Sequence, residues 1–598
     1  MALAVIRGPP VEPRDLELQQ AIGAHDAERQ SGQLRYPRVM TARSLRALAL
    51  PFFANCPAVI LGCATDDATV APAPAADSGV AEASAPEASP CPPDKLPPAI
   101  DAGSADGTSA DAARGEGASL SSIQHVVVLY LENHSFDNLF GSWPGADGAE
   151  TAPGTAIVQV GPDGRPYKTL PQYAPFPPGV ASLVDAKVPN RPFDLTQYAV
   201  SEGALTNDLL HRFYQEQSQI HGGRMDSFVL YNDESAGESM GYWPTATLPI
   251  PIWMKQHPRD TTLCDHFFHA AFGGSFLNHF WLIAARTPVY ENAPNGEFGV
   301  VVQLGPDQQL PKVLDTASLP ARQVYNTNGG DNEVTPDGYA VNTAYSVNEP
   351  HPRTFDPGAG VPNLLPQQTF PTIADALDAN GVSWAWYAGG WNAALAAAGL
   401  GAVGTCSGSE VVPDGGPTFQ YHHQPFVYFK NWGGNANDGG VGNKPPNGKW
   451  AVNQNLKDEL DFLNEVNRGL LPAVSFVKPL YDEHPNYTTE TSSENHAVEI
   501  LNALVASSLY PSTVVLVTYD ENGGFWDHVA PPKTDRWGPG TRVPLIVVSP
   551  FAKGGIDKTV YDTTAILRLI ERRWGLPPLT SRDQGQKDLA SHALKLAP

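Results

Sequence analysis

Two pairs of oxygen-bearing side chains each follow a strongly apolar run of the sequence. The run HVVVLYL ends in Glu132 and Asn133, and the run TVVLVTY ends in Asp520 and Glu521. Three neighbouring carboxylates repel one another unless a cation neutralises them, and oxygen ligands suit one hard ion such as Ca²⁺, Mg²⁺, Mn²⁺ or iron. The alternative is that these residues only cap helices or close turns. Two pairs at equivalent strand ends favour the metal.

A serine in a glycine-rich segment is the candidate nucleophile. Ser275 follows Gly273 and Gly274 in HAAFGGSFLNHFWL and precedes an apolar, helix-like run. Small residues permit a sharp turn, and a helix N-terminus favours an anionic ligand beside the serine. A serine hydroxyl is a weak nucleophile that needs a base or a metal, and the predicted ion would supply one. The alternative is that Ser275 is a helix N-cap.

Five of the sixteen histidines are candidates for acid–base or phosphate-binding roles. The strongest is His484, which lies just beyond an apolar run, because ligand sites of parallel sheets occur at strand ends. For each of the others a packed or surface imidazole is the alternative, since histidine is commonly of intermediate burial. The five are His211, His422, His423, His484 and His528.

Short buried strands that alternate with helices would position these residues. Nearly continuous apolar runs begin at residues 125, 382, 473, 513 and 543, as is typical of strands buried on both faces. The amphipathic segments ENHAVEILNALVAS and TTAILRLIERRWG indicate helices, the second ending in basic residues and glycine. The pattern predicts an α/β fold with a mainly parallel central sheet and helices on both faces. Ligands of such sheets bind at the carboxyl ends of the strands.

Length and charge limit the class of protein. The 598 residues, 42% of them hydrophobic, are enough to bury a substantial core. The net charge of −25 argues against nucleic acid as a partner, because binding to the phosphate backbone requires a cationic surface. We predict one catalytic domain over residues 121–598, preceded over residues 64–120 by a disordered linker rich in Ala, Pro, Asp and Ser.

The segment before this linker resembles a bacterial lipoprotein signal, spanning residues 40–63. Arg43 and Arg46 precede an apolar run that is too short and too broken by proline to span a bilayer, and the run ends in Cys63. Residues 1–39 would then be an upstream extension of a mis-assigned start. The alternatives are an ordinary cleaved signal peptide or a membrane anchor. We therefore expect an exported bacterial protein, either periplasmic or attached to a membrane only through an N-terminal lipid anchor.

Two cysteines fall within the predicted catalytic domain. Cys264 and Cys406 would form one disulfide after export, or remain two buried thiols. The sequence does not favour either arrangement.

Seven segments together resemble the bacterial phosphoesterase family, which joins exported acid phosphatases to non-haemolytic phospholipases C within the alkaline phosphatase superfamily. The resemblance runs from about residue 121 to the C-terminus and implies an alkaline-phosphatase-like fold. In chain order the segments are LENHSFDNLFG, IHGGRMDSF, FGGSFLNHFWL, YHHQPFVYF, DEHP, TYDENGGFWDHVAPP and DRWGPGTRVPLIVVSPFAKGG.

The resemblance implies a role for each matching residue. The ligands of a single metal ion and a nucleophile that also contacts it match Glu132, Asn133, Asp520, Glu521 and Ser275. The histidines that surround the phosphoryl group, which the Asn133 amide would also contact, match His211, His422, His423 and His484. Protonated histidines would stabilise charge on the phosphoryl oxygens, and His422 or His484 would protonate the leaving oxygen.

The leading expectation is a metal-dependent acid phosphatase that hydrolyses small phosphorylated substrates of broad range through a phosphoserine. YHHQPFVYF and VYDTTAILRLIE favour that branch, as does Gly273-Gly274-Ser275 at the place where phospholipase C relatives often show a Gly-Pro-Thr segment. The runner-up is a phospholipase C that recognises phospholipid head groups and cleaves the diester. A third hypothesis, from another class, is a surface lipoprotein that binds phosphorylated ligands without turnover. Metal identity, oligomeric state and physiological substrate stay open.

Overall fold

The structure is a computed structural model, and every residue it describes belongs to one compact unit, Ala85–Pro598. No described helix is both long enough and apolar enough to cross a bilayer. The predicted upstream extension and signal, with Cys63, and almost all of the predicted linker lie outside the described residues, so the predicted domain boundaries stay predictions. The described residues are 118–172, 187–198, 205–232, 236–293, 304–315, 322–325, 333–352, 364–398, 419–433, 453–480, 484 and 489–597.

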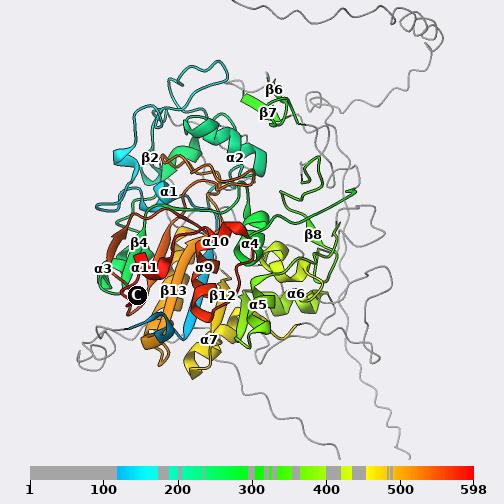
Figure 1. Ribbon diagram of the computed structural model, residues 1–598. Coiled ribbons are helices and arrows are strands. Elements are labelled where there is room, and N and C mark those ends of the chain that lie inside the picture. The colour runs from blue at the N-terminus through cyan, green and yellow to red at the C-terminus, as the bar shows by residue number, and fades with distance from the viewer. Residues whose placement is uncertain are drawn as a thin grey trace, which may run out of the picture. The chain divides into compact units, whose positions relative to one another are not determined.

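An eight-stranded sheet forms the centre of the described structure (Figure 1). All its strands run parallel except β14, which is antiparallel to both neighbours. The α/β class with a mainly parallel sheet is thus confirmed, and all five predicted strands lie in it. In spatial order the strands are β11 (Leu456–Asp458), β10 (Trp384–Ala388), β12 (Val474–Lys478), β1 (His125–Leu131), β13 (Thr513–Tyr519), β14 (Leu545–Val548), β4 (Thr261–Cys264) and β15 (Gly555–Asp557).

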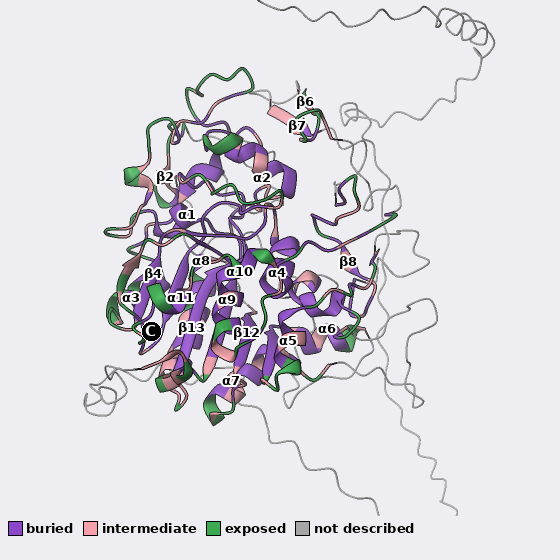
Figure 2. Cartoon of the chain, in the orientation of Figure 1, coloured by how far each residue is buried: buried purple, intermediate pink, exposed green. Residues whose placement is uncertain are grey.

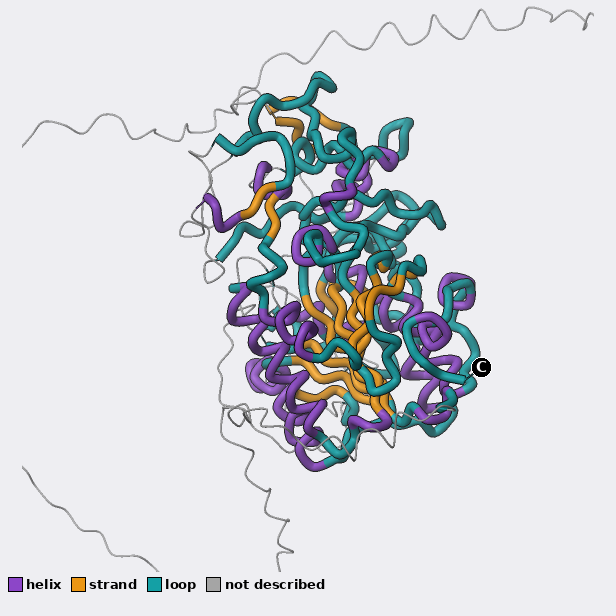
Figure 3. Tube along the Cα trace, turned by 90° about the vertical axis from the view of Figure 1, so that its left-hand side faces the viewer, coloured by secondary structure: helices purple, strands orange, loops and turns teal. Residues whose placement is uncertain are grey.

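Helices cover both faces of this sheet, as predicted (Figure 3). One set of contacting helices is α3 (Pro249–Gln256), α7 (Glu459–Arg468) and α8 (Glu490–Ala506). A second set is α4 (Ser275–Ala284), α5 (Ile373–Ala379), α9 (Thr564–Trp574), α10 (Ser581–Gln584) and α11 (Leu589–His592). Figure 2 shows the strands between them as buried, which explains their almost uninterrupted apolar sequences.

Smaller elements complete the described structure. The helices α1 (Phe136–Phe140) and α2 (Phe213–Ile220) lie beyond the carboxyl ends of the central strands (Figure 1), and α6 (Trp391–Ala397) contacts β11. Four two-stranded ladders surround the main sheet. They pair β2 (Phe193–Asp194) with β3 (Gly241–Tyr242), β5 (Phe267–Phe268) with β16 (Tyr561–Asp562), β6 (Lys312–Asp315) with β7 (Arg322–Tyr325), and β8 (Tyr345–Ser346) with β9 (Leu364–Leu365).

The pairing of β1 with β13 decides where the site lies. The two strands are parallel neighbours in register, with Leu131 opposite Tyr519. The next residue of each strand, Glu132 and Asp520, therefore leaves the sheet at the same edge. That edge is the carboxyl end, where open parallel sheets bind their ligands.

One of the two cysteines of the predicted domain can be placed. Cys264 ends β4 and carries a free, fully buried thiol, and burial raises its pKa well above the usual value. Cys406 lies outside the described residues. The choice between one disulfide and two buried thiols therefore stays a prediction.

Candidate active site

The two predicted ligand pairs meet at the carboxyl edge of the sheet. Glu132, Asn133, Asp520 and Glu521 are all fully buried. One carboxylate oxygen of each of the three acidic residues lies within 4.8 Å of the others. The backbone N–H of Asn133 donates to Asp520 Oδ1 at 3.1 Å, which fixes one pair against the other.

Backbone conformation at both strand ends holds these pairs in place. Asn133 has a left-handed backbone with φ of 64°, and Gly523 has φ of 59°. A Cβ atom at Gly523 would lie only 2.1 Å from the carbonyl oxygen of Asn133. The Gly523 N–H donates to Glu521 Oε2 at 2.6 Å. Only glycine allows the loop after β13 to approach the loop after β1 this closely.

The amide of Asn133 can be placed in two orientations, which direct either its nitrogen or its oxygen at the carboxylates. The amide atom that faces the carboxylates lies 2.5 Å from Glu521 Oε1 and 2.8 Å from Glu132 Oε2. If that atom is nitrogen, it donates to both carboxylates, and the amide oxygen accepts from His484 Nε2 at 3.1 Å. If it is oxygen, acceptors from all three side chains converge, and only a cation would stabilise them. The Asn133 side chain can therefore bind a cation through its oxygen, or donate to the two carboxylates through its nitrogen when no ion is bound.

Ser275 is the first residue of α4 and points its hydroxyl at the ligand cluster. Ser275 Oγ donates to Glu132 Oε2 at 2.7 Å and lies 3.3 Å from Asn133 Oδ1. The N-cap of α4 is Gly274, so the alternative of an N-cap serine is wrong. The hydroxyl is therefore directed at the carboxylate and not at the helix backbone.

A buried glutamate that the sequence did not reveal holds the turn before Ser275. Glu216 on α2 accepts from Gly273 N at 2.7 Å and from Thr541 N at 2.9 Å, and it pairs with His269 Nε2 at 2.8 Å. Gly273 has φ of 88°, and a Cβ there would lie 2.5 Å from the backbone nitrogen of Phe213. The nucleophile turn is therefore packed directly against α2.

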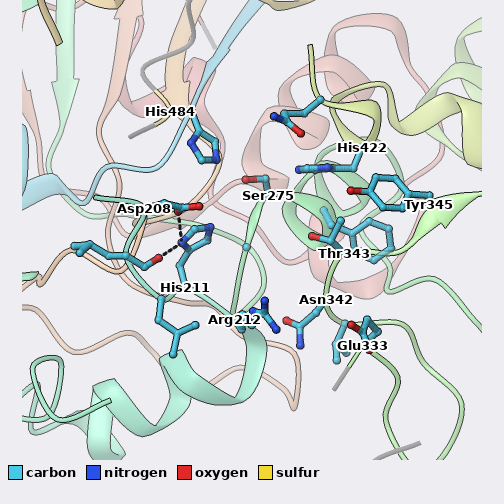
Figure 4. Close-up of a pocket in the computed structure, with 16 residues that line it drawn as sticks. Asp208, His211, Arg212, Ser275, Glu333, Asn342, Thr343, Tyr345, His422 and His484 are labelled. Atoms are coloured by element: carbon cyan, nitrogen blue, oxygen red, sulfur yellow. Dashed lines mark hydrogen bonds and ion pairs between the residues drawn. The ribbon is translucent and has the colours of Figure 1, made fainter. Parts of the chain in front are cut away.

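Three of the predicted histidines share a cavity with Ser275. Figure 4 shows Ser275 between His484, His211 and His422, in a cavity of about 360 Å³. His211 Nε2 lies 3.7 Å from Glu521 Oε1, and its Nδ1 lies 2.5 Å from the carbonyl oxygen of Leu209. Three imidazoles therefore line the cavity that Ser275 borders.

The other two predicted histidines lie elsewhere. His423 is buried behind Glu132, with Nε2 3.1 Å from Glu132 Oε1, and its ring stacks on His279 at a centroid distance of 5.0 Å. Burial, followed by the charges of Lys478 and the neighbouring histidines, lowers the pKa of His423 well below its usual value. Its environment therefore favours the neutral ring. His528 lies outside the cavity and binds Asp137 Oδ2 through Nδ1 at 2.6 Å.

Lys478 is a further member of the cluster that the sequence did not reveal. It is the last residue of β12, its side chain is buried, and its Nζ forms an ion pair with Glu132 Oε1. The sequence signal was weak, because a lysine at the end of a strand is usually a solvated residue.

The charges of the cluster fit a bound cation. Burial and the neighbouring Asp520 and Glu132 raise the pKa of Glu521 well above its usual value. Burial also opposes ionisation of Asp520, but the charges of Lys478 and His279 lower its pKa overall. The cluster therefore gathers three buried carboxylates whose charges oppose one another, and the atoms that these three side chains offer to an ion are oxygens. These properties suit a hard metal ion, whose identity the residues do not determine.

In a second acidic cluster nearby, the carboxylates are neutralised by an arginine. Asp137, Asp527 and His528 also gather their polar atoms within 4.8 Å. There Arg542, fully buried, donates to Asp527 Oδ1 at 2.9 Å and to Asp137 Oδ1 at 3.3 Å. This cluster carries its own cation, so it calls for no metal.

Known proteins resemble this chain over most of its length. The model of the "Phosphoesterase family" matches residues 123–577. The chain is 25% identical over 496 residues to "Phospholipase C B" of Mycobacterium tuberculosis, which covers 77% of this chain and 74% of that protein. It is 23% identical over 499 residues to "Non-hemolytic phospholipase C" of Pseudomonas aeruginosa, covering 77% and 55%. The resemblance found in the motifs is confirmed, and because the family model spans most of the chain, the protein belongs to the phosphoesterase family.

Proposed function

We propose that the protein hydrolyses phosphate esters with Ser275 as nucleophile, beside a metal ion held by Glu132, Asn133, Asp520 and Glu521. The observation that carries the proposal is the direction of the Ser275 hydroxyl, which donates to Glu132 Oε2 and borders a cavity lined by histidines. The proposed nucleophile, the histidines that would bind an anion and the proposed ligands of a cation thus lie next to one another, as phosphoryl transfer requires.

The residues of the site divide the chemistry between them. A bound ion would neutralise the carboxylates and stabilise charge on the phosphoryl oxygens. Ser275 Oγ passes its proton towards Glu132 Oε2, attacks phosphorus and forms a P–O bond as the bond to the leaving oxygen breaks. His422 or His484 protonates the leaving oxygen. A water molecule then gives a proton back to that imidazole and attacks phosphorus; the bond from phosphorus to Ser275 Oγ breaks, the phosphoryl group leaves on the water oxygen, and Oγ recovers its proton from Glu132.

The favoured substrate class is a phospholipid, cleaved as a diester to diacylglycerol and a phosphorylated head group. Support comes from the relatives, which are named phospholipase C and align with 77% of this chain. Assignment to this class replaces acid phosphatase as the leading hypothesis. The 360 Å³ cavity is of the size of a small-molecule site and would accept a head group.

Hydrolysis of soluble phosphomonoesters is the second candidate, because polar side chains line much of the cavity. Besides the histidines, its wall contains both acidic and basic groups and several neutral donors and acceptors. These are Asp208, Arg212, Glu333, Asn342, Thr343 and Gln420. Such a wall suits a polar alcohol group, whether that group belongs to a lipid head group or to a free phosphate ester.

Product analysis separates these candidates. The purified protein is given phosphatidylcholine in mixed micelles, and separately a soluble phosphomonoester, and phosphocholine and inorganic phosphate are measured. A phospholipase C releases phosphocholine from the lipid, whereas a phosphatase releases phosphate from the monoester. Ser275→Ala should remove either activity by several orders of magnitude while the fold is kept. Ser581→Ala is the matched control, because Ser581 also opens a helix but is exposed.

Three results would contradict the proposal. Full turnover by Ser275→Ala, or a phosphoenzyme trapped at another residue, would exclude Ser275 as the nucleophile. Tight binding of phosphate esters without any turnover by the wild-type protein would favour the hypothesis of a binding protein.

A further inference from the structure

We propose that the Lys478 ammonium occupies the place of a second metal ion, so that the site works with one ion and one built-in cation. This inference rests on the proposed metal site. The two oxygens of Glu132 have different partners: Oε2 accepts from Ser275, and Oε1 contacts Lys478 Nζ. One carboxylate therefore joins the nucleophile to a buried positive charge.

The surroundings of Glu132 Oε1 have the composition of a metal site. Glu132, His279 and His423 form a group whose ligand atoms lie within 4.8 Å of one another, next to the group formed by Glu132, Asp520 and Glu521. The two groups share Glu132. Two-metal phosphoesterases use such adjacent sites to bind ions about 3.5 to 4 Å apart.

His279 strengthens this comparison. The side chain is fully buried, and its Nδ1 lies 2.7 Å from the carbonyl oxygen of Ser275. Its Nε2 has no hydrogen-bond partner among the described residues. A buried ring nitrogen without a partner is costly in an ordinary core and is the kind of atom that a metal ion would bind.

Lys478 supplies this second group with a positive charge that, unlike a metal ion, cannot dissociate from the protein. The two side chains of the Lys478–Glu132 pair are 2% and 0% exposed, so the charges are scarcely screened by water. With the three carboxylates ionised, one ammonium and one divalent ion balance their charge. Lys478 is not among the residues that line the cavity. It is therefore a positioning residue that acts on the substrate through Glu132.

Counting bound ions tests the proposal. The wild-type protein, freed of metal and dialysed against Mn²⁺, should bind one ion per chain. Lys478→Ala removes the ammonium and opens space, so it should bind two. The second ion should disappear again in Lys478→Ala combined with His279→Gln. Electron paramagnetic resonance gives an independent measure, because two neighbouring Mn²⁺ ions couple magnetically and a single ion does not.

Two further variants complete the design. Lys478→Arg keeps the cation and should still bind one ion. Lys478→Met keeps the volume of the side chain but not its charge, so it should bind its single Mn²⁺ at least about tenfold more tightly, because charge repulsion is removed. Lys457→Ala is the matched control: this lysine on β11 also pairs with a glutamate, Glu465, at 2.6 Å, and should leave ion number and affinity unchanged.

The outcomes separate this proposal from the proposed function. Two ions bound by the wild-type protein would overturn the role of Lys478, as would one ion in Lys478→Ala together with unchanged or weaker binding in Lys478→Met. An active wild-type protein that binds no divalent ion would instead refute the proposed metal-dependent mechanism. Circular dichroism and thermal unfolding show which variants are folded, and if Lys478→Ala is unfolded, the affinity of Lys478→Met decides.

Discussion

Replacing Gly523 by alanine would test how closely the two ligand loops are fitted together. A left-handed backbone costs alanine roughly 1 to 2 kcal/mol relative to glycine, and the less flexible unfolded chain offsets about half of this. The added methyl group would also lie 2.1 Å from the Asn133 carbonyl oxygen and 2.7 Å from its carbon, so the backbone must move. Overpacking of this kind costs a further 1 to 3 kcal/mol, roughly. We expect Gly523→Ala to lower the free energy of unfolding by about 1.5 to 4 kcal/mol.

The matched control is Gly575→Ala at the end of α9. Gly575 has φ of 66°, close to that of Gly523, but nothing lies within 4 Å of an added Cβ. The free energy of unfolding of Gly575→Ala should therefore fall by only about 1 kcal/mol, and urea unfolding of both variants would measure the difference. Gly523→Ala should also bind metal roughly 10-fold more weakly, because it moves the residues that orient the ligands. Equal losses of stability in the two variants would refute the close approach of the loops.

Three further predictions concern the ion, the nucleophile turn and pH. Chelation should abolish turnover and lower the unfolding free energy by about 2.7 kcal/mol if the ion had been present at 100 times its Kd, with both restored when the ion is added back. Glu216→Gln should lower kcat while metal stoichiometry stays unchanged, since Glu216 orients the Gly273 N–H and contacts no ligand carboxylate; an unchanged kcat would contradict this role. Burial lowers the pKa of His269, but Glu216 overcomes this effect and raises it overall. The pair should therefore stabilise the fold fully below about pH 6.5 and lose this contribution as pH rises through the raised pKa. Urea midpoints from pH 6 to 9 should show a larger loss in the wild type than in His269→Asn.

The sequence predicted those parts of the structure that follow from local patterns. Continuous apolar runs identified five strands of the sheet, and the rule that ligands bind at strand ends brought Glu132 together with Asp520. Lys478 and Glu216 were missed because their local sequences look ordinary: one ends a strand, and the other lies in a polar helix. Their roles come from partners 346 and 57 residues away in the chain, which periodicity does not reveal.

The substrate class was also beyond what the motifs determine. The segments that carry the ligands and the nucleophile describe the phosphoryl chemistry, and that chemistry is common to monoesters and diesters. Recognition of the rest of the substrate would depend instead on the cavity wall, to which residues such as Asn342 and Thr343 contribute from irregular segments. Such segments have no periodic sequence pattern, so the leading expectation of a phosphatase had little physical basis beyond the resemblance.

The pairing of β1 with β13 also sets the order in which the protein can acquire activity. During synthesis Glu132 and Asn133 are made early, but their partners follow 388 residues later, after most of the domain. Bringing such distant segments together is the slow kind of step in folding, because a long loop must close before the contact stabilises it. A nascent or truncated chain that ends before Thr513 therefore carries the serine but only half of the ligand set, and should remain inactive until the segment from Thr513 onward has folded.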